Sequence, residues 1–267
     1  MASILITSGG TKVPIDEVRH IGNMSSGRFG ADLAKEALFA GHKVLFLCAK
    51  GSVRPDQIVL DLKQDFLAEG VKALADNMAL AELAKNRLTV IEYRDFDDYL
   101  AKLEDILQPT TPQRLGVTFD VIMLAAAVSD YGMPPTGGKI SSDKDDITFT
   151  LTKLPKVITR VRELAPKSVM VGFKLLVDVT PEVMDAAVAK QIENSGSDFV
   201  VANDLRSIKQ GGHTVYIYKK DDADPFNPVV SDYLPAKAVI SYVTGAWKNP
   251  APLVRRRLHP AAVKESP

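Results

Sequence analysis

Two short segments hold residue types suited to binding a phosphorylated ligand, because small and polar side chains follow apolar runs in both. Gly9 and Gly10 follow the apolar residues 4–6, and the sequence Ala-Ala-Ala-Val-Ser-Asp at 125–130 follows the apolar residues 121–124. Small residues at the carboxyl ends of buried strands let backbone N–H groups approach a ligand closely, as in α/β proteins that bind phosphates and nucleotides. The two segments therefore predict a nucleotide or phosphate site.

The first segment continues to the start of an expected helix. Ser25 and Gly27 lie just before the helical pattern, and Gly30 lies in its first turn. N–H groups at a helix N-terminus favour an anion, although a serine cap and a closely packed glycine would leave the same pattern. The glycine pair after the first strand is not the dinucleotide-binding fingerprint, because Pro14 follows it and no helix starts directly after. The two stretches together favour an anion site.

Four further residues could serve the same site, and each has an ordinary structural alternative. Asp130 is expected to point into the gap beside the alanines at 125–127, unless a helix packs closely over that strand. Lys139 could meet a phosphate as a point charge, although an isolated loop lysine is usually just solvated. Phe173 could stack on a nucleobase or belong to the core. Asn203 could bind a ribose or a base edge, or cap a turn.

The hydrophobic periodicity predicts the elements that must position these residues. Strands are expected at residues 4–7, 43–47, 89–93, 119–125, 168–173 and 199–202. Helices are expected between 27 and 41, and at 67–85, 96–107, 155–164 and 180–195. Alternating patterns at 146–151 and 213–218 predict a small antiparallel subsidiary layer, while 10–24 and 131–138 are expected to be irregular. Parallel strands joined by helices form right-handed βαβ units. The predicted fold is a Rossmann-like three-layer α/β/α arrangement with a mostly parallel central sheet.

Composition narrows the class of protein. We expect one domain over residues 1–245 and a Pro- and Arg-rich tail at 246–267 that frays. The 33 basic and 33 acidic residues balance, so nothing predicts attraction to nucleic acid or to an acidic membrane. Cys48 is the single cysteine and is expected in the core, and the four histidines lack metal-ligand spacing. No apolar run approaches the ~20 residues of a membrane helix. The expectation from composition is a soluble cytoplasmic protein, and no metal ligands are predicted.

In their order, these motifs resemble phosphopantothenate–cysteine ligases, the family that joins 4′-phosphopantothenate to cysteine in coenzyme A synthesis. The resemblance runs from about residue 4 to 218 and rests on residues 7–14, 23–30, 125–130, 139–140, 171–174 and 201–204. No flavin-dependent decarboxylase domain precedes it, so the stand-alone form is expected. The resemblance implies Mg²⁺, a homodimer in which residues 146–151 and 213–218 pair across the interface, and CTP or ATP as co-substrate. Residues 139–142 and those after Phe173 look more like the ATP-using eukaryotic-type branch than the CTP-using bacterial branch, and the nucleotide stays open.

Site roles follow from the same resemblance, position by position. It implies nucleotide contacts at Gly9, Ser25, Gly27, Gly30, Phe173 and Asn203. It implies contacts to phosphopantothenate or the acyl intermediate at Asn23, Ala126, Ala127 and Asp130. Two of the residues have catalytic roles by resemblance, since Asn23 would hold the intermediate during attack by cysteine and Lys139 would neutralise the triphosphate.

Two other functions compete with this interpretation. A short-chain NAD(P)-dependent oxidoreductase would use the Tyr-x-x-x-Lys pattern of Tyr233 and Lys237. That pair needs one helix, which Pro235 between the two residues argues against. A non-catalytic nucleotide-binding protein is the second alternative, and the intact Asn23, Asp130 and Lys139 argue against it.

Overall fold

The computed structural model describes residues 1–267 except 57–67, 109–117, 144, 222–227, 233 and 246–267. The chain divides into two compact units, residues 1–171 and 172–267. Eight strands of the described part belong to one mixed sheet in the order β12-β11-β10-β9-β6-β1-β4-β5. The predicted α/β class with a mostly parallel sheet is confirmed. The single domain expected over 1–245 stays a prediction, and the expected tail lies outside the described residues.

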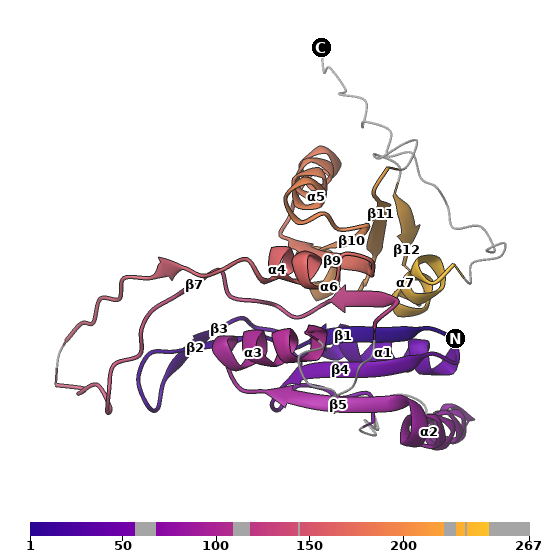
Figure 1. Ribbon diagram of the computed structural model, residues 1–267, viewed down its shortest axis with the longest axis horizontal. Coiled ribbons are helices and arrows are strands. Elements are labelled where there is room, and N and C mark those ends of the chain that lie inside the picture. The colour runs from indigo at the N-terminus through magenta and orange to yellow at the C-terminus, as the bar shows by residue number, and fades with distance from the viewer. Residues whose placement is uncertain (57–67, 109–117, 144, 222–227, 233, 246–267) are drawn as a thin grey trace, which may run out of the picture. The chain divides into compact units, whose positions relative to one another are not determined.

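Parallel strands form the centre of unit 1 (Figure 1). They are β1 (Ser3–Ser8), β4 (Lys43–Ala49), β5 (Leu88–Tyr93) and β6 (Val121–Leu124), and β9 (Val169–Leu176) begins in this unit. The helices are α1 (Arg28–Phe39), α2 (Ala68–Arg87), α3 (Phe96–Leu107) and α4 (Val157–Leu164). Each of these helices and strands was expected within two residues of these bounds, except that β9 extends three residues beyond its predicted end. Because β1, β4, β5 and β6 run parallel, their carboxyl ends lie at one edge of the sheet.

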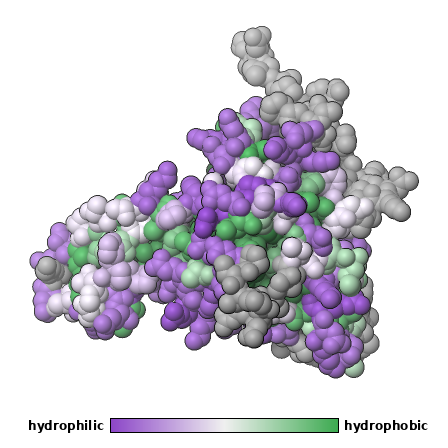
Figure 2. Space-filling view, in the orientation of Figure 1, coloured by the Kyte–Doolittle hydropathy of each residue, from purple (hydrophilic) through white to green (hydrophobic). Residues whose placement is uncertain are grey.

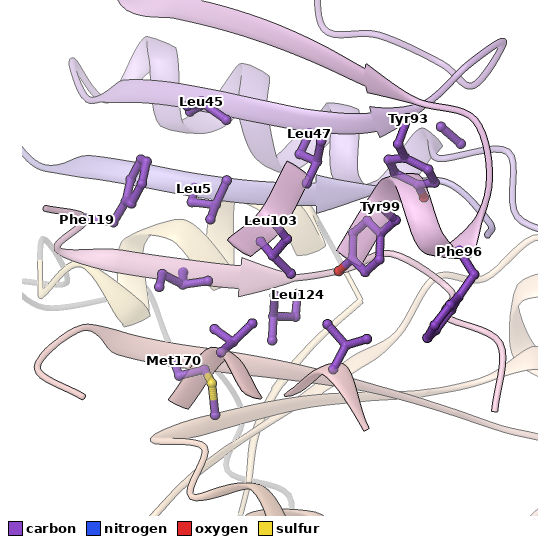
Figure 3. Packing of buried hydrophobic residues seen from close by; sticks show 14 of the residues in the cluster. Leu5, Leu45, Leu47, Tyr93, Phe96, Tyr99, Leu103, Phe119, Leu124 and Met170 are labelled. Carbon is purple, nitrogen blue, oxygen red and sulfur yellow. The ribbon is translucent and has the colours of Figure 1, made fainter. Parts of the chain in front are cut away.

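The core of unit 1 explains why α3 forms where it does. Asp95 caps the helix by accepting the Asp98 N–H at 2.8 Å. Phe96, Tyr99 and Leu103 then recur on one helical face and are buried against the sheet (Figure 3). The opposite face of the sheet is covered by α1, which packs on β1 and β4. Helices on both faces of a parallel sheet give the predicted three layers.

Two short antiparallel pairs replace segments that were expected to be irregular. In the hairpin, β2 (Lys12–Pro14) pairs with β3 (His20–Gly22), and elsewhere β7 (Tyr131–Gly132) pairs with β8 (Thr152–Lys153). The strand predicted at 146–151 is wrong, because these residues form no ladder and are almost all exposed. The alternation there had no sheet face to bury. In Figure 1 the hairpin tip and the segment between β7 and β8 extend to the left of the parallel strands.

Unit 2 has an antiparallel ladder of its own. Its strands are β10 (Phe199–Asp204), β11 (Val215–Lys219) and β12 (Val229–Ser231), and its helices are α5 (Pro181–Ser195), α6 (Leu205–Lys209) and α7 (Pro235–Val243). The strand expected at 213–218 exists as β11, but it belongs to the main sheet instead of a subsidiary layer. The helix expected at 180–195 is confirmed, with Thr180 at its N-cap and Pro181 in its first turn, and Gly196 ends α5 in the left-handed conformation. Among the described residues, no helix combines the length and apolar character needed to cross a membrane.

Candidate active site

The start of α1 lies directly against the end of β1. Gly27 precedes the helix with a φ of 77° and, as a glycine, supplies no side-chain cap, while the Ser26 hydroxyl accepts the Arg28 N–H at 3.4 Å. Ser8 at the end of β1 donates its hydroxyl hydrogen to the Gly27 carbonyl at 2.9 Å. Ser25 is half-buried, and its N–H donates to the Asn23 carbonyl at 3.0 Å. The alternative of a serine cap is thus represented by this long bond from Ser26, and an anion at the start of α1 stays a prediction.

Glycine is required at three positions where backbone segments nearly touch, which we call the glycine cluster: Gly9, Gly27 and Gly30. A Cβ on Gly9 would lie 2.7 Å from the Ala49 Cβ, and one on Gly30 would lie 2.7 Å from the Ser8 Cβ. A Cβ on Gly27 would lie 3.0 Å from the Ser8 hydroxyl oxygen. The ends of β1 and β4 and the start of α1 therefore pack closely, which is the structural alternative given for Gly30, and the nucleotide contacts implied for these glycines stay predictions.

Asn23 and Ala127 meet beside this cluster. The Asn23 side-chain amide donates to the Ala127 carbonyl at 2.9 Å, and the Thr11 N–H donates to the same oxygen at 3.1 Å. The Ala127 N–H donates to the Gly9 carbonyl at 2.8 Å. A Cβ on Gly10 would collide with the Asn23 carbonyl oxygen. The segment that contains Gly9 and Asn23 and the segment 125–130 are therefore hydrogen-bonded to each other, at the carboxyl ends of the parallel strands of unit 1.

Buried hydroxyl groups support this junction, and the sequence analysis assigned them no role. Thr7 accepts the Ala126 N–H at 3.2 Å, and Thr11 accepts the Ser129 N–H at 2.8 Å. The Tyr99 hydroxyl reaches Thr7 at 3.4 Å, and burial raises the pKa of Tyr99 to about 12. A hydroxyl side chain directly after an apolar strand could have predicted this supporting role, because a buried hydroxyl must find a hydrogen-bond partner.

The alanines that follow β6 lie at the edge of the core, where Ala126 packs against the hydrophobic cluster. Ala126 and Ala127 are half-buried, and the contacts to phosphopantothenate implied for them stay predictions. Asp130 lies in a more exposed position, where its carboxylate pairs with Lys156 at 2.6 Å. Lys139 is exposed on the segment between β7 and β8. Of the predicted residues in unit 1, the hydrogen-bonded junction holds those of the glycine cluster with Asn23 and Ala127, while Asp130 and Lys139 lie outside it.

The two predicted residues of unit 2 have surroundings of their own. Phe173 is half-buried on β9, which continues to Leu176 instead of ending at the phenylalanine. The Asn203 amide lies 3.4 Å from His213 Nε2. Asp204, the residue after Asn203, caps α6 by accepting the Arg206 N–H at 2.7 Å. The turn-capping role that competed for Asn203 is therefore performed by its neighbour.

Other chemistries find little support among the described residues. No cluster of three or more His, Cys, Asp or Glu side chains there could hold a metal ion. Burial raises the pKa of the Cys48 thiol to about 11, which does not suit a nucleophile. Lys237 of the oxidoreductase pattern lies on α7, but that helix begins only at Pro235. Tyr233 lies outside the described residues.

Comparison with known proteins identifies the relatives of this site. The family described as DNA/pantothenate metabolism flavoprotein C-terminal domain matches residues 1–84 and 109–245. A phosphopantothenate–cysteine ligase of Mus musculus is 32% identical over 234 residues, which are 77% of this chain and 73% of the relative. The Homo sapiens ligase is 31% identical over 246 residues, 82% of this chain and 76% of the relative.

A longer relative and two solved structures agree with these matches. The coenzyme A biosynthesis bifunctional protein CoaBC of Thermococcus kodakarensis is 30% identical over 220 residues, 82% of this chain but only 45% of the relative. A flavoprotein structure from Streptococcus pneumoniae has a TM-score of 0.70 at 24% identity, covering 92% of this chain and 100% of that one. The Cab2 mutant H337A complex with phosphopantothenate-cysteine has a TM-score of 0.73 at 22% identity, covering 92% and 86%. This chain therefore belongs to the family of the DNA/pantothenate metabolism flavoprotein C-terminal domain, together with curated phosphopantothenate–cysteine ligases.

Proposed function

We propose that this enzyme joins 4′-phosphopantothenate to cysteine in coenzyme A biosynthesis, using a nucleoside triphosphate to activate the acid. The observation that carries the proposal is the hydrogen-bonded junction of the glycine cluster with Asn23 and Ala127 at the carboxyl edge of unit 1. The fold and the relatives named ligases support it. The glycine cluster offers backbone to an anion, and the Asn23–Ala127 pair offers an amide beside it.

In the first step, the phosphopantothenate carboxylate attacks the α-phosphate of the nucleotide. Pyrophosphate leaves, and an acyl-nucleotidylate forms. The start of α1 and the glycine cluster stabilise negative charge on the phosphates. Lys139 neutralises further charge as a cation, and Phe173 and Asn203 contact the nucleotide, as the family resemblance implies. This step needs no protein nucleophile, in agreement with the inert, buried Cys48.

In the second step, the amine of cysteine attacks the acyl carbon, forming the amide and releasing the nucleoside monophosphate. Asn23 holds the acyl intermediate for this attack, and Ala126, Ala127 and Asp130 contact the phosphopantothenate part. Asn23 is exposed, and its side-chain amide donates a hydrogen bond to the Ala127 carbonyl. Catalysis then rests on orientation and charge stabilisation.

Magnesium enters this scheme as part of the nucleotide substrate. Mg²⁺ is commonly bound by one or two carboxylates together with substrate phosphates, keeping several waters, so the reaction does not require a dedicated cluster of protein ligands. CTP and ATP are both retained as candidates for the nucleotide.

A homodimer is the proposed assembly, and exposed apolar side chains support it. The hairpin and the segment from β7 to β8 together expose six large hydrophobic residues: Val18, Ile21, Met24, Tyr131, Ile147 and Leu151. Figure 2 shows hydrophobic residues among hydrophilic ones on this projecting part of unit 1. Apolar surface of this kind marks protein interfaces. A second copy of the chain is the occupant expected from the resemblance.

The deciding experiment measures pyrophosphate release from purified protein with 4′-phosphopantothenate, cysteine and Mg²⁺, with CTP and ATP in parallel. We expect release that depends on phosphopantothenate, and the faster nucleotide identifies the branch. Asn23→Ala should leave release in the first turnover measurable but slow formation of the amide at least ~10-fold. Asn86→Ala, an exposed asparagine at the end of α2, is the matched control. Absence of release with both nucleotides would contradict the ligase and favour a protein that only binds nucleotide.

A further inference from the structure

The turn between β2 and β3 holds the chain just after Lys139. Asp16 in this turn is a carboxylate that is only 5% exposed. Its Oδ2 accepts the Ile140 N–H at 3.1 Å and the Arg19 guanidinium N–H at 2.8 Å. The same Arg19 nitrogen, Nη1, also donates to the Ile140 carbonyl at 3.1 Å. One ion pair therefore binds both backbone groups of the residue that follows Lys139.

The turn also holds the chain just before Lys139. The Glu17 N–H donates to the Gly138 carbonyl at 3.2 Å, and the Gly138 N–H donates to the Glu17 carboxylate at 3.3 Å. The Thr136 N–H donates to the Ile15 carbonyl at 2.8 Å. The backbone is thus fixed on both sides of Lys139, whose own side chain is exposed. The glycine-rich segment around Lys139 is therefore hydrogen-bonded to the β2–β3 hairpin.

Asp16 has a complete set of partners for its charge. Its Oδ1 accepts the Val18 N–H at 2.8 Å and the Arg19 N–H at 2.7 Å. Burial alone would raise the pKa of Asp16, but these bonds and those from Ile140 and the Arg19 side chain outweigh it and lower the pKa to about 2. The anion therefore persists at neutral pH, and charge-assisted bonds of this kind are stronger than neutral ones.

The hairpin connects this anchor to the junction described above. Its base pairs Lys12 with Gly22, next to Asn23, and its last pair joins Pro14 to His20, next to the turn. Three residues of strand span about 10 Å. The same short hairpin thus places Asn23 at its base and the anchor of Lys139 at its tip, at a set separation.

We propose that Asp16 is a positioning residue that fixes Lys139 for the nucleotide-activating step. The inference rests on the proposed function, because that function gives Lys139 its role. Asp16 touches no substrate in this scheme. It acts by keeping the backbone on either side of the lysine in one place, so that less ordering is required when the triphosphate binds.

The first test measures the anchor without any assay of activity. Hydrogen exchange of a peptide covering residues 136–142, and tryptic cleavage after Lys139, are compared in wild type, Asp16→Asn and Asp98→Asn. Asp98 is the matched control, because it also accepts a backbone N–H, from Arg94 at 2.9 Å, and pairs with a cation, Lys102, at 2.9 Å. We expect both rates to rise ~10-fold or more in Asp16→Asn only. Equal rates in wild type and Asp16→Asn would overturn the proposal.

The second test asks whether Asp16 acts through Lys139. Pyrophosphate release is measured for Asp16→Asn, Lys139→Ala and the double variant. We expect Asp16→Asn to lower kcat ~10-fold with little change in the KM for cysteine, and to cause no further loss in the Lys139→Ala background. Full additivity of the two losses would refute the positioning role. If wild type releases no pyrophosphate, the proposed function fails, while the exchange experiment still decides whether Asp16 anchors the segment.

Discussion

Replacing Gly30 by alanine tests whether the close approach of α1 to β1 is essential. The new Cβ would lie 2.7 Å from the Ser8 Cβ, about 0.7 Å inside an ordinary contact of 3.4 Å, and closer still to the Ser8 hydroxyl oxygen. Ser8 cannot turn away without losing its bond to the Gly27 carbonyl. The helix must therefore shift outward from the strand, together with the glycine cluster at its start.

Two opposing contributions set the sign of the stability change. Alanine is the better helix former by at most about 1 kcal/mol. Overpacking a tight contact costs about 1–3 kcal/mol, and the upper half of that range applies because the obstacle includes the Cβ of a fully buried residue on a central strand. We expect Gly30→Ala to lower the free energy of unfolding by about 1–2 kcal/mol and to weaken nucleotide binding.

Urea denaturation followed by circular dichroism, with calorimetric titration of nucleotide, measures both effects. Gly137→Ala is the control, because nothing lies within 4 Å of its added Cβ, and its stability should match wild type. Ser8→Gly removes the obstacle, so Gly30→Ala should cost much less in that background. A Gly30→Ala protein as stable as wild type, with unchanged nucleotide affinity, would refute the close-approach argument.

Three further outcomes are expected. Asn23→Ala should change the unfolding midpoint little, because the residue is exposed, and still reduce amide formation in a coupled assay. Burial raises the pKa of Cys48 to about 11, so about one thiol in a thousand is ionised at pH 8. An aromatic disulfide reagent should therefore react with Cys48 only after denaturant is added. Fast reaction of the native protein would contradict this expectation. Because the pKa of Asp16 is lowered from 3.8 to about 2, its stabilisation is present above about pH 4 and is lost as pH falls toward 2. Melting temperatures measured over that interval should fall less steeply in Asp16→Asn than in wild type.

The central strands and helices could be predicted from the sequence because their patterns are local. Residues 96–107, for example, have an apolar helical face, with a capping residue before them and a proline soon after them. The helix α3 has these same bounds. The hairpin of β2 and β3 could not be predicted, since each strand has three residues and its stability comes from contacts more than a hundred residues away, such as Asp16 with Ile140. The alternation at 146–151 misled for the opposite reason, because period-two patterning forms a strand only where a partner is available.

Several of the predicted site residues are glycine or alanine, so unlike most catalytic residues they have no reactive group in the side chain. Gly9, Gly27 and Gly30 allow backbone segments to meet, and Ala127 contributes through its N–H and carbonyl, which bond to Gly9 and Asn23. A reaction that forms no covalent bond to the protein needs accurately placed dipoles more than a strong nucleophile. Replacing these glycines or Ala127 by larger residues should therefore reduce activity more than removing nearby charged side chains does. A site built on ion pairs would lose more activity when the charged side chains are removed.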